Sequence, residues 1–201
     1  LQDAKSYSPY DMVYSEIYGM NQVSVQDVLH ILEKNGVTVE QVIQLPYIRD
    51  DVFNYLPVTE INRDFGCDYQ IQEGEFLNLF QYNLEDGYEH NIQPVSTVTI
   101  SGDRKLQSVG TDVKILFNQN PTFADKTLII NDSDFEKLSA DITGSAGIAN
   151  LFQFQNWEDS YAGVCEVKEY LQESNQLNED EQTYYELSSK VEKYQDAKKS
   201  G

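Results

Sequence analysis

The stretch NEDEQTYYELSSKVEKYQDAKKSG, residues Asn178–Gly201, ends the chain and has the pattern of one long helix. Tyr184 and Val191 lie seven residues apart. Leu187 and Tyr194 each follow one of them three places later, which puts a narrow apolar seam along one side of a helix. Acidic residues crowd the start of the stretch and lysines its end, which complements the helix dipole. We therefore expect a long C-terminal helix over 178–201.

Lysines lie close to both ends of the chain, at Lys5, Lys198 and Lys199. Leu1–Tyr7 contains no helix-capping pattern, and no turn signal ends the C-terminal stretch. The pattern of a secretory signal peptide is absent. A lysine beside a membrane-spanning helix lays its stem in the interface while its ammonium reaches lipid phosphates. We expect the C-terminal helix to be membrane-proximal and both ends to continue into membrane segments. A free protein with lysine-tipped ends is the alternative.

The composition is that of a folded and strongly acidic protein. Of the 201 residues 40% are hydrophobic, which is enough for a core. The chain has 14 Lys and Arg against 34 Asp and Glu, a net charge of −20. Such a charge repels nucleic acid and attracts cationic ligands, although it can also serve only to keep a domain soluble. No apolar run approaches the roughly 18 residues that a membrane-spanning helix needs.

Both ends of the chain have the pattern of a strand followed by a helix. The β-prone Tyr10–Ile17 precedes a helix that Ser24 caps and Asn35-Gly36 ends. The β-prone Ile148–Gln155 precedes a second helix, which Asn156 caps. We expect strands from the two ends to join in one sheet.

The middle of the chain has a different character. From Arg49 to Asn118, turn signals containing glycine or proline recur between short β-prone runs, a spacing typical of antiparallel hairpins. Thr127–Ile130 is a short and mostly apolar strand, and a helix follows it from near Asp134 to Ala140.

These patterns predict an α+β fold with a mixed sheet, packed helices and a long C-terminal helix. The expected domains are a terminal α/β lobe of residues 1–48 and 146–177, a β-rich insert lobe of residues 49–145, and the membrane-proximal helix of residues 178–201.

No signature of catalysis, cofactor binding or metal binding is present. The only histidines, His30 and His90, are the sole conventional bases for a hydrolytic triad, and neither has a nucleophile motif beside it. Asp132–Glu136 begins like a calcium loop but lacks the glycine and the later glutamate of that loop. Cys67 and Cys165 allow one disulfide or two free thiols, and no Cys-x-x-Cys pair exists. We therefore expect no enzyme, no cofactor and no metal site.

The remaining signal is a combination of acidic and aromatic residues in the β-rich insert. Carboxylates attract a cationic peptide, and aromatic rings accept its apolar and cationic side chains. A solvated sheet edge with core aromatics is the alternative. The peptide-binding candidates are Asp64, Phe65, Asp68, Tyr69, Glu73, Glu75, Tyr82, Glu85, Asp86, Tyr88 and Glu89.

Several stretches together resemble a known family. They are PYDMV at Pro9–Val13, TLIINDSDFEKL at Thr127–Leu138, FQFQNW at Phe152–Trp157, and the polar C-terminal helix ending in Ser-Gly. The chain resembles the large extracellular domain of the bacitracin-resistance-type, BceB-like permeases of the FtsX family of ABC transporters, found in Gram-positive bacteria. The resemblance covers essentially the whole chain, but residues 49–118 match by position alone.

This resemblance implies an extracellular, non-catalytic domain on the outer face of the cell membrane, held between two membrane helices. The intact permease would work with a cytoplasmic ATPase subunit and often with a sensor histidine kinase. The domain would bind or sense cationic antimicrobial peptides of the bacitracin or lantibiotic type, or their lipid-linked complexes. The alternatives are a related FtsX-like permease that docks a protein partner or handles lipids or lipoproteins, and a secreted enzyme.

Overall fold

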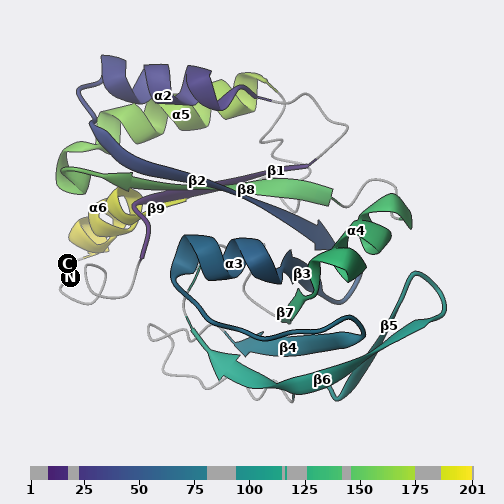
Figure 1. Cartoon of the computed structure of the whole chain (residues 1–201). Helices are drawn as coiled ribbons and strands as arrows, with labels where there is room; N and C mark the ends of the chain where they lie inside the picture. Colours follow the sequence, from purple (N-terminus) through teal and green to yellow (C-terminus); the bar gives the residue numbers. More distant parts are fainter. Residues whose placement is uncertain are drawn as a thin grey trace. The chain divides into compact units, whose positions relative to one another are not determined.

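The computed structural model describes residues 9–17, 23–80, 94–114, 116, 126–141, 146–174 and 187–200. The chain forms two compact units (Figure 1). Unit 1 comprises Leu1–Gln44, Phe117–Thr122 and Ile148–Gly201, and unit 2 comprises Leu45–Leu116 and Phe123–Gly147. Strand β2 (Val39–Arg49) begins in unit 1 and ends in unit 2.

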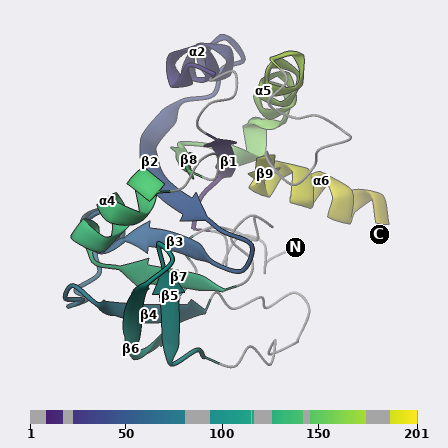
Figure 2. The ribbon, with the colours of Figure 1, turned by 90° about the vertical axis from the view of Figure 1, so that its right-hand side faces the viewer.

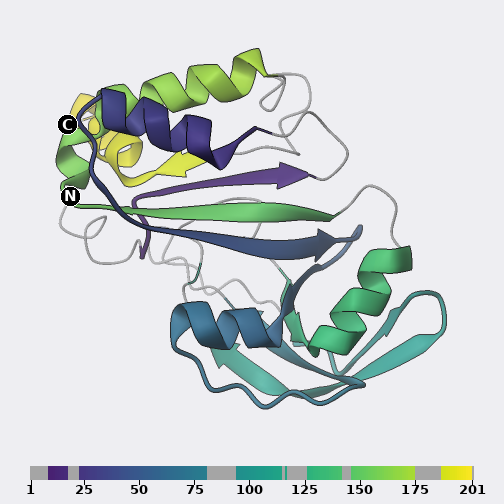
Figure 3. The same ribbon diagram turned by 45° about the horizontal axis from the view of Figure 1, so that its top comes forward.

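Unit 1 is a small sheet covered by helices. Its strands follow the order β2-β8-β1-β9, so the strands from the two ends of the chain share one sheet, as expected. Helices α2 and α5 lie side by side on these strands (Figures 1 and 3). The elements of unit 1 besides β2 are β1 (Met12–Ile17), α2 (Val25–Lys34), β8 (Ala146–Phe154, from Ile148 on), the 3-10 turn η2 (Trp157–Asp159), α5 (Tyr161–Glu173), β9 (Leu187–Ser189) and α6 (Lys190–Ser200).

The core of unit 1 lies between the sheet and its helices α2 and α5. Met12 and Tyr14 of β1 point into it together with Phe152 of β8, whose ring stacks on Tyr14 with centroids 5.7 Å apart. The helices contribute buried residues at helical spacing. These are Val28 and Leu32 from α2, and Val164, Val167 and Leu171 from α5.

The ends of α2 follow from its sequence. The Ser24 hydroxyl accepts a hydrogen bond from the Gln26 N–H at 3.2 Å, which satisfies one of the free amides of the first turn. Gly36 takes a left-handed conformation with φ of 76° directly after the helix, where a side chain would be strained. The helix capped by Ser24 and ended at Asn35-Gly36 is therefore confirmed.

Unit 2 is a mixed sheet with two helices. Its strand order is β5-β6-β4-β7-β3-β2, and Figure 2 shows β3, β7 and β4 side by side. The pairs β3–β7 and β4–β6 are parallel, whereas β4–β7, β5–β6 and β2–β3 are antiparallel. The elements besides β2 are β3 (Asn54–Pro57), α3 (Val58–Phe65), β4 (Glu75–Phe80), β5 (Thr97–Ile100), β6 (Arg104–Val113), β7 (Thr127–Ile130) and α4 (Asp132–Asp141).

Strand β7 is the central strand that its apolar sequence predicts. All four of its residues are buried, and it lies between β3 and β4. Its side chains join the core of unit 2 with Ile48, Tyr55, Phe76 and Leu138. A strand covered on both faces reads as a nearly continuous apolar run, which is why Thr127–Ile130 could be recognised.

The α+β fold class with a mixed sheet and a C-terminal helix is confirmed, but the predicted extent of that helix is wrong. Leu187–Ser189 forms strand β9, which pairs antiparallel with Met12–Tyr14, and helix α6 begins only at Lys190. The Ser189 hydroxyl accepts from the Glu192 N–H at 3.2 Å and donates to the Glu192 carboxylate at 2.8 Å, so Ser189 caps the first turn of α6. Residues 178–186, the first part of the predicted helix, lie outside the described residues, and so does Gly201 at its end.

Two further points follow from the described residues. Cys67 and Cys165 are both free and half-buried, so they form no disulfide with each other. Across the ranges that the structure describes, no helix is both long enough and apolar enough to cross a membrane.

Candidate functional site

The predicted acidic and aromatic residues that the structure describes lie in unit 2, between α3 and β4. Asp64 and Phe65 end α3, Asp68, Tyr69 and Glu73 lie in the loop that follows, and Glu75 begins β4. The other candidates, Tyr82, Glu85, Asp86, Tyr88 and Glu89, lie outside the described residues.

Hydrogen bonds hold the loop between α3 and β4 in one conformation. Gly66, with φ of 64°, ends α3 in the left-handed conformation that a glycine adopts without strain. The Asn62 amide then brackets the backbone of Tyr69, donating to its carbonyl at 3.0 Å and accepting from its N–H at 2.9 Å. Asn131 donates to the Ile71 carbonyl at 3.0 Å. The loop is therefore a built surface on which the acids have defined positions.

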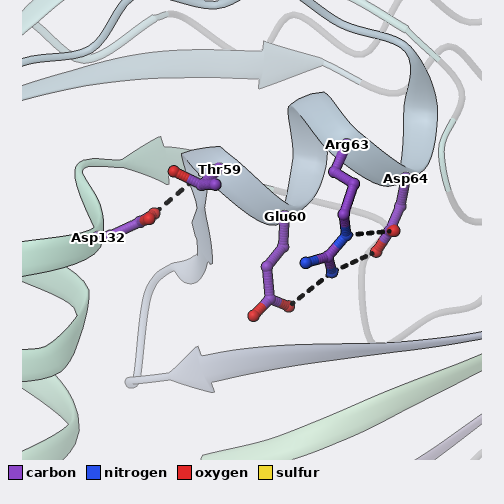
Figure 4. A network of polar contacts seen from close by, with 5 residues as sticks. All are labelled: Thr59, Glu60, Arg63, Asp64 and Asp132. Atoms are coloured by element: carbon purple, nitrogen blue, oxygen red, sulfur yellow. Dashed lines mark hydrogen bonds and ion pairs between the residues drawn. The ribbon is translucent and has the colours of Figure 1, made fainter.

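Two of the predicted carboxylates are already used inside unit 2. Arg63 donates to both oxygens of Asp64, at 3.0 and 3.3 Å, and lies 3.9 Å from Glu60 (Figure 4). Glu75 accepts a hydrogen bond from the Gln72 N–H at 2.8 Å. Their charges are thus partly satisfied before any ligand arrives.

Helix α3 was not predicted from the sequence, and it positions this network. Its first turn is held by Asp132, which accepts from the Thr59 N–H at 3.1 Å (Figure 4). Burial raises the pKa of Glu60, and the nearby Arg63 opposes that rise. The signals for α3 are the apolar Val58 and Ile61 three residues apart and the glycine that follows the helix.

The remaining carboxylates face solvent. Asp68 and Glu73 are both exposed, and neither forms an ion pair with any residue in the described part of the chain. Asp68 accepts only a hydrogen bond from the neighbouring Gln70 side chain at 3.3 Å. These two carboxylates are the negative groups of this loop that can meet an incoming cation directly.

The rings of this loop are only half-exposed. The Tyr69 hydroxyl donates to Asp112 at 2.5 Å. Burial raises the pKa of Tyr69 well above its ordinary value, and the hydrogen bond to Asp112 raises it further. Beside it, the Lys114 ammonium lies 3.2 Å from the Cys67 sulfur. The hydroxyl of Tyr69 is therefore engaged within unit 2, and only the face and edge of its ring remain for a ligand.

Unit 1 contains a buried ion pair that the sequence reading missed. The Lys190 ammonium lies 3.0 Å from Asp11, and each side chain is only 9% exposed. The second oxygen of Asp11 accepts from the Phe154 N–H at 2.6 Å. The ammonium also lies 5.3 Å from the centre of the Trp157 ring. This cluster joins the residue before β1 to the first residue of α6.

A second buried polar group in unit 1 was also missed. Tyr14 and Glu16 of β1 are 1% and 7% exposed, and the Tyr14 hydroxyl and one Glu16 oxygen have no hydrogen-bond partner among the described residues. Burial raises the pKa of Glu16 to about 7. No sequence signal marks these positions, because alternation in a strand predicts which face a residue takes and not whether it finds a partner.

The remaining sequence expectations concern metal ligands and histidine bases. No group of three or more His, Cys, Asp or Glu side chains there could hold a metal ion. His30 is exposed on α2, and His90 lies outside the described residues.

Comparisons with known proteins give likenesses of fold. No family model and no curated protein matches the sequence. Among solved structures, a candidate lipoprotein from Bacillus anthracis is similar over 80% of this chain and 92% of its own, at 10% identity and a TM-score of 0.48. The periplasmic region of MacB from Actinobacillus actinomycetemcomitans is similar over 98% of this chain and 97% of its own, at 8% identity and a TM-score of 0.39.

Proposed function

We propose that this chain is the extracellular, non-catalytic domain of an ABC transporter permease, and that it binds cationic peptide antibiotics or their lipid-linked complexes. The ligands would be of the bacitracin or lantibiotic type. In the intact protein, a cytoplasmic ATPase subunit would supply energy, and a sensor histidine kinase would receive the signal. The proposal places the domain on the outer face of a Gram-positive cell membrane.

The observation that carries the proposal is the pairing of the first and last described strands of unit 1. Strand β1 pairs with β9, with Met12 opposite Ser189, and the Asp11 carboxylate lies 3.0 Å from the Lys190 ammonium. The first and last strands described in unit 1 are therefore neighbours in its sheet, and α6 follows directly from the second of them. A domain inserted in the loop between two adjacent membrane helices needs this arrangement.

The charge of the chain supports a cationic ligand. A net charge of −20 speeds the arrival of a positively charged peptide and disfavours the capture of a bare lipid pyrophosphate. The exposed Asp68 and Glu73 provide carboxylates beside the half-exposed rings of Phe65 and Tyr69. A surface of this kind attracts the ammonium groups of a peptide and packs against its apolar side chains.

The proposal is tested by titrating the protein with a lantibiotic and with the same peptide after acetylation of its lysines. We expect the intact peptide to bind, and its affinity to fall as NaCl rises from about 50 to about 500 mM, because salt screens exposed charges. The acetylated peptide should bind more weakly. If neither peptide binds, or if both bind equally well at every salt concentration, the proposed function is wrong.

A pair of charge-matched variants then locates the surface. Asp68→Asn with Glu73→Gln removes two exposed carboxylates from the candidate loop, whereas Glu136→Gln with Asp141→Asn removes two exposed carboxylates from α4. Each exposed ion pair contributes up to about 1 kcal/mol, so the loss of two should weaken binding by the loop variant by up to about thirtyfold. Equal losses in the two variants would place the peptide elsewhere on the protein.

A further inference from the structure

The end of strand β1 contains a cluster of oxygen atoms between the sheet and its two helices. Tyr14 and Glu16 lie two residues apart in β1, so their side chains point to the same face of the sheet. That face is the one covered by α2 and α5, because Tyr14 packs in the core with Val28 of α2 and Leu171 of α5. The Glu16 side chain therefore points from the sheet toward α2 and α5.

The helices contribute a second acid and a second phenol. Asp27 lies in the first turn of α2 and accepts a hydrogen bond from the Tyr170 hydroxyl of α5 at 2.8 Å. The negative charge of Glu16 is close enough to both phenols to raise the pKa of Tyr14 and of Tyr170, in each case after burial as the main cause. The four residues Tyr14, Glu16, Asp27 and Tyr170 are called the oxygen cluster below.

Two buried oxygen atoms of the oxygen cluster lack a hydrogen-bond partner among the described residues. Tyr14 is 1% exposed and Glu16 is 7% exposed, yet the Tyr14 hydroxyl and one oxygen of Glu16 have no hydrogen-bond partner in the described ranges. Buried polar atoms without partners are costly, and native proteins retain few of them. Two such atoms at one place leave room in their bonding for a donor that is not among the described residues.

No lysine or histidine described on the surrounding helices neutralises the negative charge of the oxygen cluster. Lys34 of α2 pairs with Glu166 at 2.7 Å, and Lys168 of α5 pairs with Glu192 at 3.2 Å. His30, one turn after Asp27, is exposed. On the side of β8, the Asn150 amide donates to the backbone carbonyl of Tyr14 and accepts from the Gln44 side chain. It forms no hydrogen bond with the Tyr14 hydroxyl.

We propose that the oxygen cluster binds a positively charged nitrogen group, the ammonium or guanidinium of a cationic ligand. Such a group donates several hydrogen bonds at once, which the unpartnered oxygens of Tyr14 and Glu16 can accept. Two phenols and only two carboxylates favour an organic cation over a metal ion, whose usual sites hold more carboxylates. The proposal deepens the proposed function by assigning a site for one peptide side chain, and it rests on that function only in taking the ligand to be a peptide.

Binding at this site is coupled to the proton of Glu16. Because burial raises the pKa of Glu16 to about 7, the carboxyl is about half protonated at neutral pH. A bound cation favours the ionised carboxylate and so lowers the pKa of Glu16. Binding therefore releases a proton, and it strengthens as pH rises through about 7.

The direct test follows the side-chain carbon of Glu16 by NMR through a pH titration of the whole protein. The titration is run with 1,5-diaminopentane, which carries the ammonium of a lysine side chain, and with NaCl at the same ionic strength. We expect saturating amine to lower the pKa of Glu16 by at least about one unit relative to NaCl, which corresponds to tenfold tighter binding of the ionised form. The same pKa in both solutions would overturn the proposal.

Variants separate this site from the surface in unit 2. Glu16→Gln keeps the shape of the side chain and removes its charge, and we expect the dissociation constant of the amine to rise at least tenfold. Asp68→Asn in unit 2 is the control and should leave amine binding unchanged. If Glu16→Gln does not fold, the NMR titration of the unaltered protein still decides.

The outcome with the peptide is independent of the outcome with the amine. A lantibiotic that binds the Glu16→Gln variant as tightly as the unaltered protein would overturn the assignment of this site and leave the proposed function standing. An amine that lowers the pKa of Glu16 when no peptide binds would support the site and overturn the proposed function.

Discussion

Replacing Asp11 with asparagine is expected to lower the free energy of unfolding by about 3 kcal/mol. Asp11 and Lys190 are each 9% exposed and lie 3.0 Å apart, and removal of one partner from a buried ion pair costs about 3–5 kcal/mol. The lower end applies here for two reasons. An asparagine can still accept from the Phe154 N–H, and Lys190 keeps its position 5.3 Å from the centre of the Trp157 ring.

An exposed ion pair in the same unit provides the matched control. Lys34 and Glu166 lie only 2.7 Å apart, but their side chains are 57% and 36% exposed. Glu166→Gln should therefore cost less than about 1 kcal/mol although the ion pair that it breaks is the shorter of the two. Burial, and not the distance between the atoms, decides the difference.

The assay is urea unfolding followed by circular dichroism for Asp11→Asn, Lys190→Met, the double variant and Glu166→Gln. The double variant leaves no unpaired buried charge, so it should recover about 2 kcal/mol of the summed losses. Equal destabilisation by Asp11→Asn and Glu166→Gln, or additive losses in the double variant, would refute the reasoning.

Two further predictions concern Glu16 and Gly163. Because its pKa is raised from 4.5 to about 7 in the folded protein, Glu16 binds more protons when folded than when unfolded, so stability should fall as pH rises through this interval. Urea unfolding at a series of pH values should show Glu16→Gln gaining up to about 3 kcal/mol over the unaltered protein between pH 4 and 8, and a constant difference would contradict this. Gly163→Ala would place a methyl group 3.0 Å from Val37 and 3.3 Å from Asn35, and it should cost about 1–2 kcal/mol in the same assay despite the better helix propensity of alanine. The exposed Glu169→Ala on the same helix should change stability by less than about 0.5 kcal/mol, and a similar loss in both variants would argue against close packing at Gly163.

Elements with local signals could be predicted from the sequence. Helix α2 has a capping serine, a spaced apolar face and a glycine at its end, and strand β7 is almost entirely apolar. Helix α3 was missed because Pro57 at its start makes no side-chain capping bond and the helix spans only eight residues. Strand β9 was missed because its three residues are held in place by β1, and a long-range pairing overrides the helix preference of the surrounding sequence.

The candidate sites depended on contacts that no local pattern encodes. Acidic and aromatic residues between α3 and β4 could be named, but the hydrogen bond of Tyr69 joins a residue 43 positions away. Asp11 and Lys190 come from opposite ends of the chain, and only the pairing of β1 with β9 brings them together. In the sequence, Glu16 is a typical polar residue of an alternating strand. Its burial, and the lack of a hydrogen-bond partner for one of its oxygens among the described residues, follow only from the fold.

The pairing of β1 with β9 has a mechanical consequence. Met12 and Ser189 are opposite each other at the end of the ladder next to Asp11 and Lys190, so a force that draws Asp11 and Lys190 apart acts on that end alone. The ladder would then open by peeling, one pair of residues after another, which takes less force than sliding the two strands lengthwise. The buried ion pair and the hydrogen bond from the Lys190 N–H to the Asp11 carbonyl at 2.9 Å lie directly beyond that end, so they would be the first contacts to bear such a load.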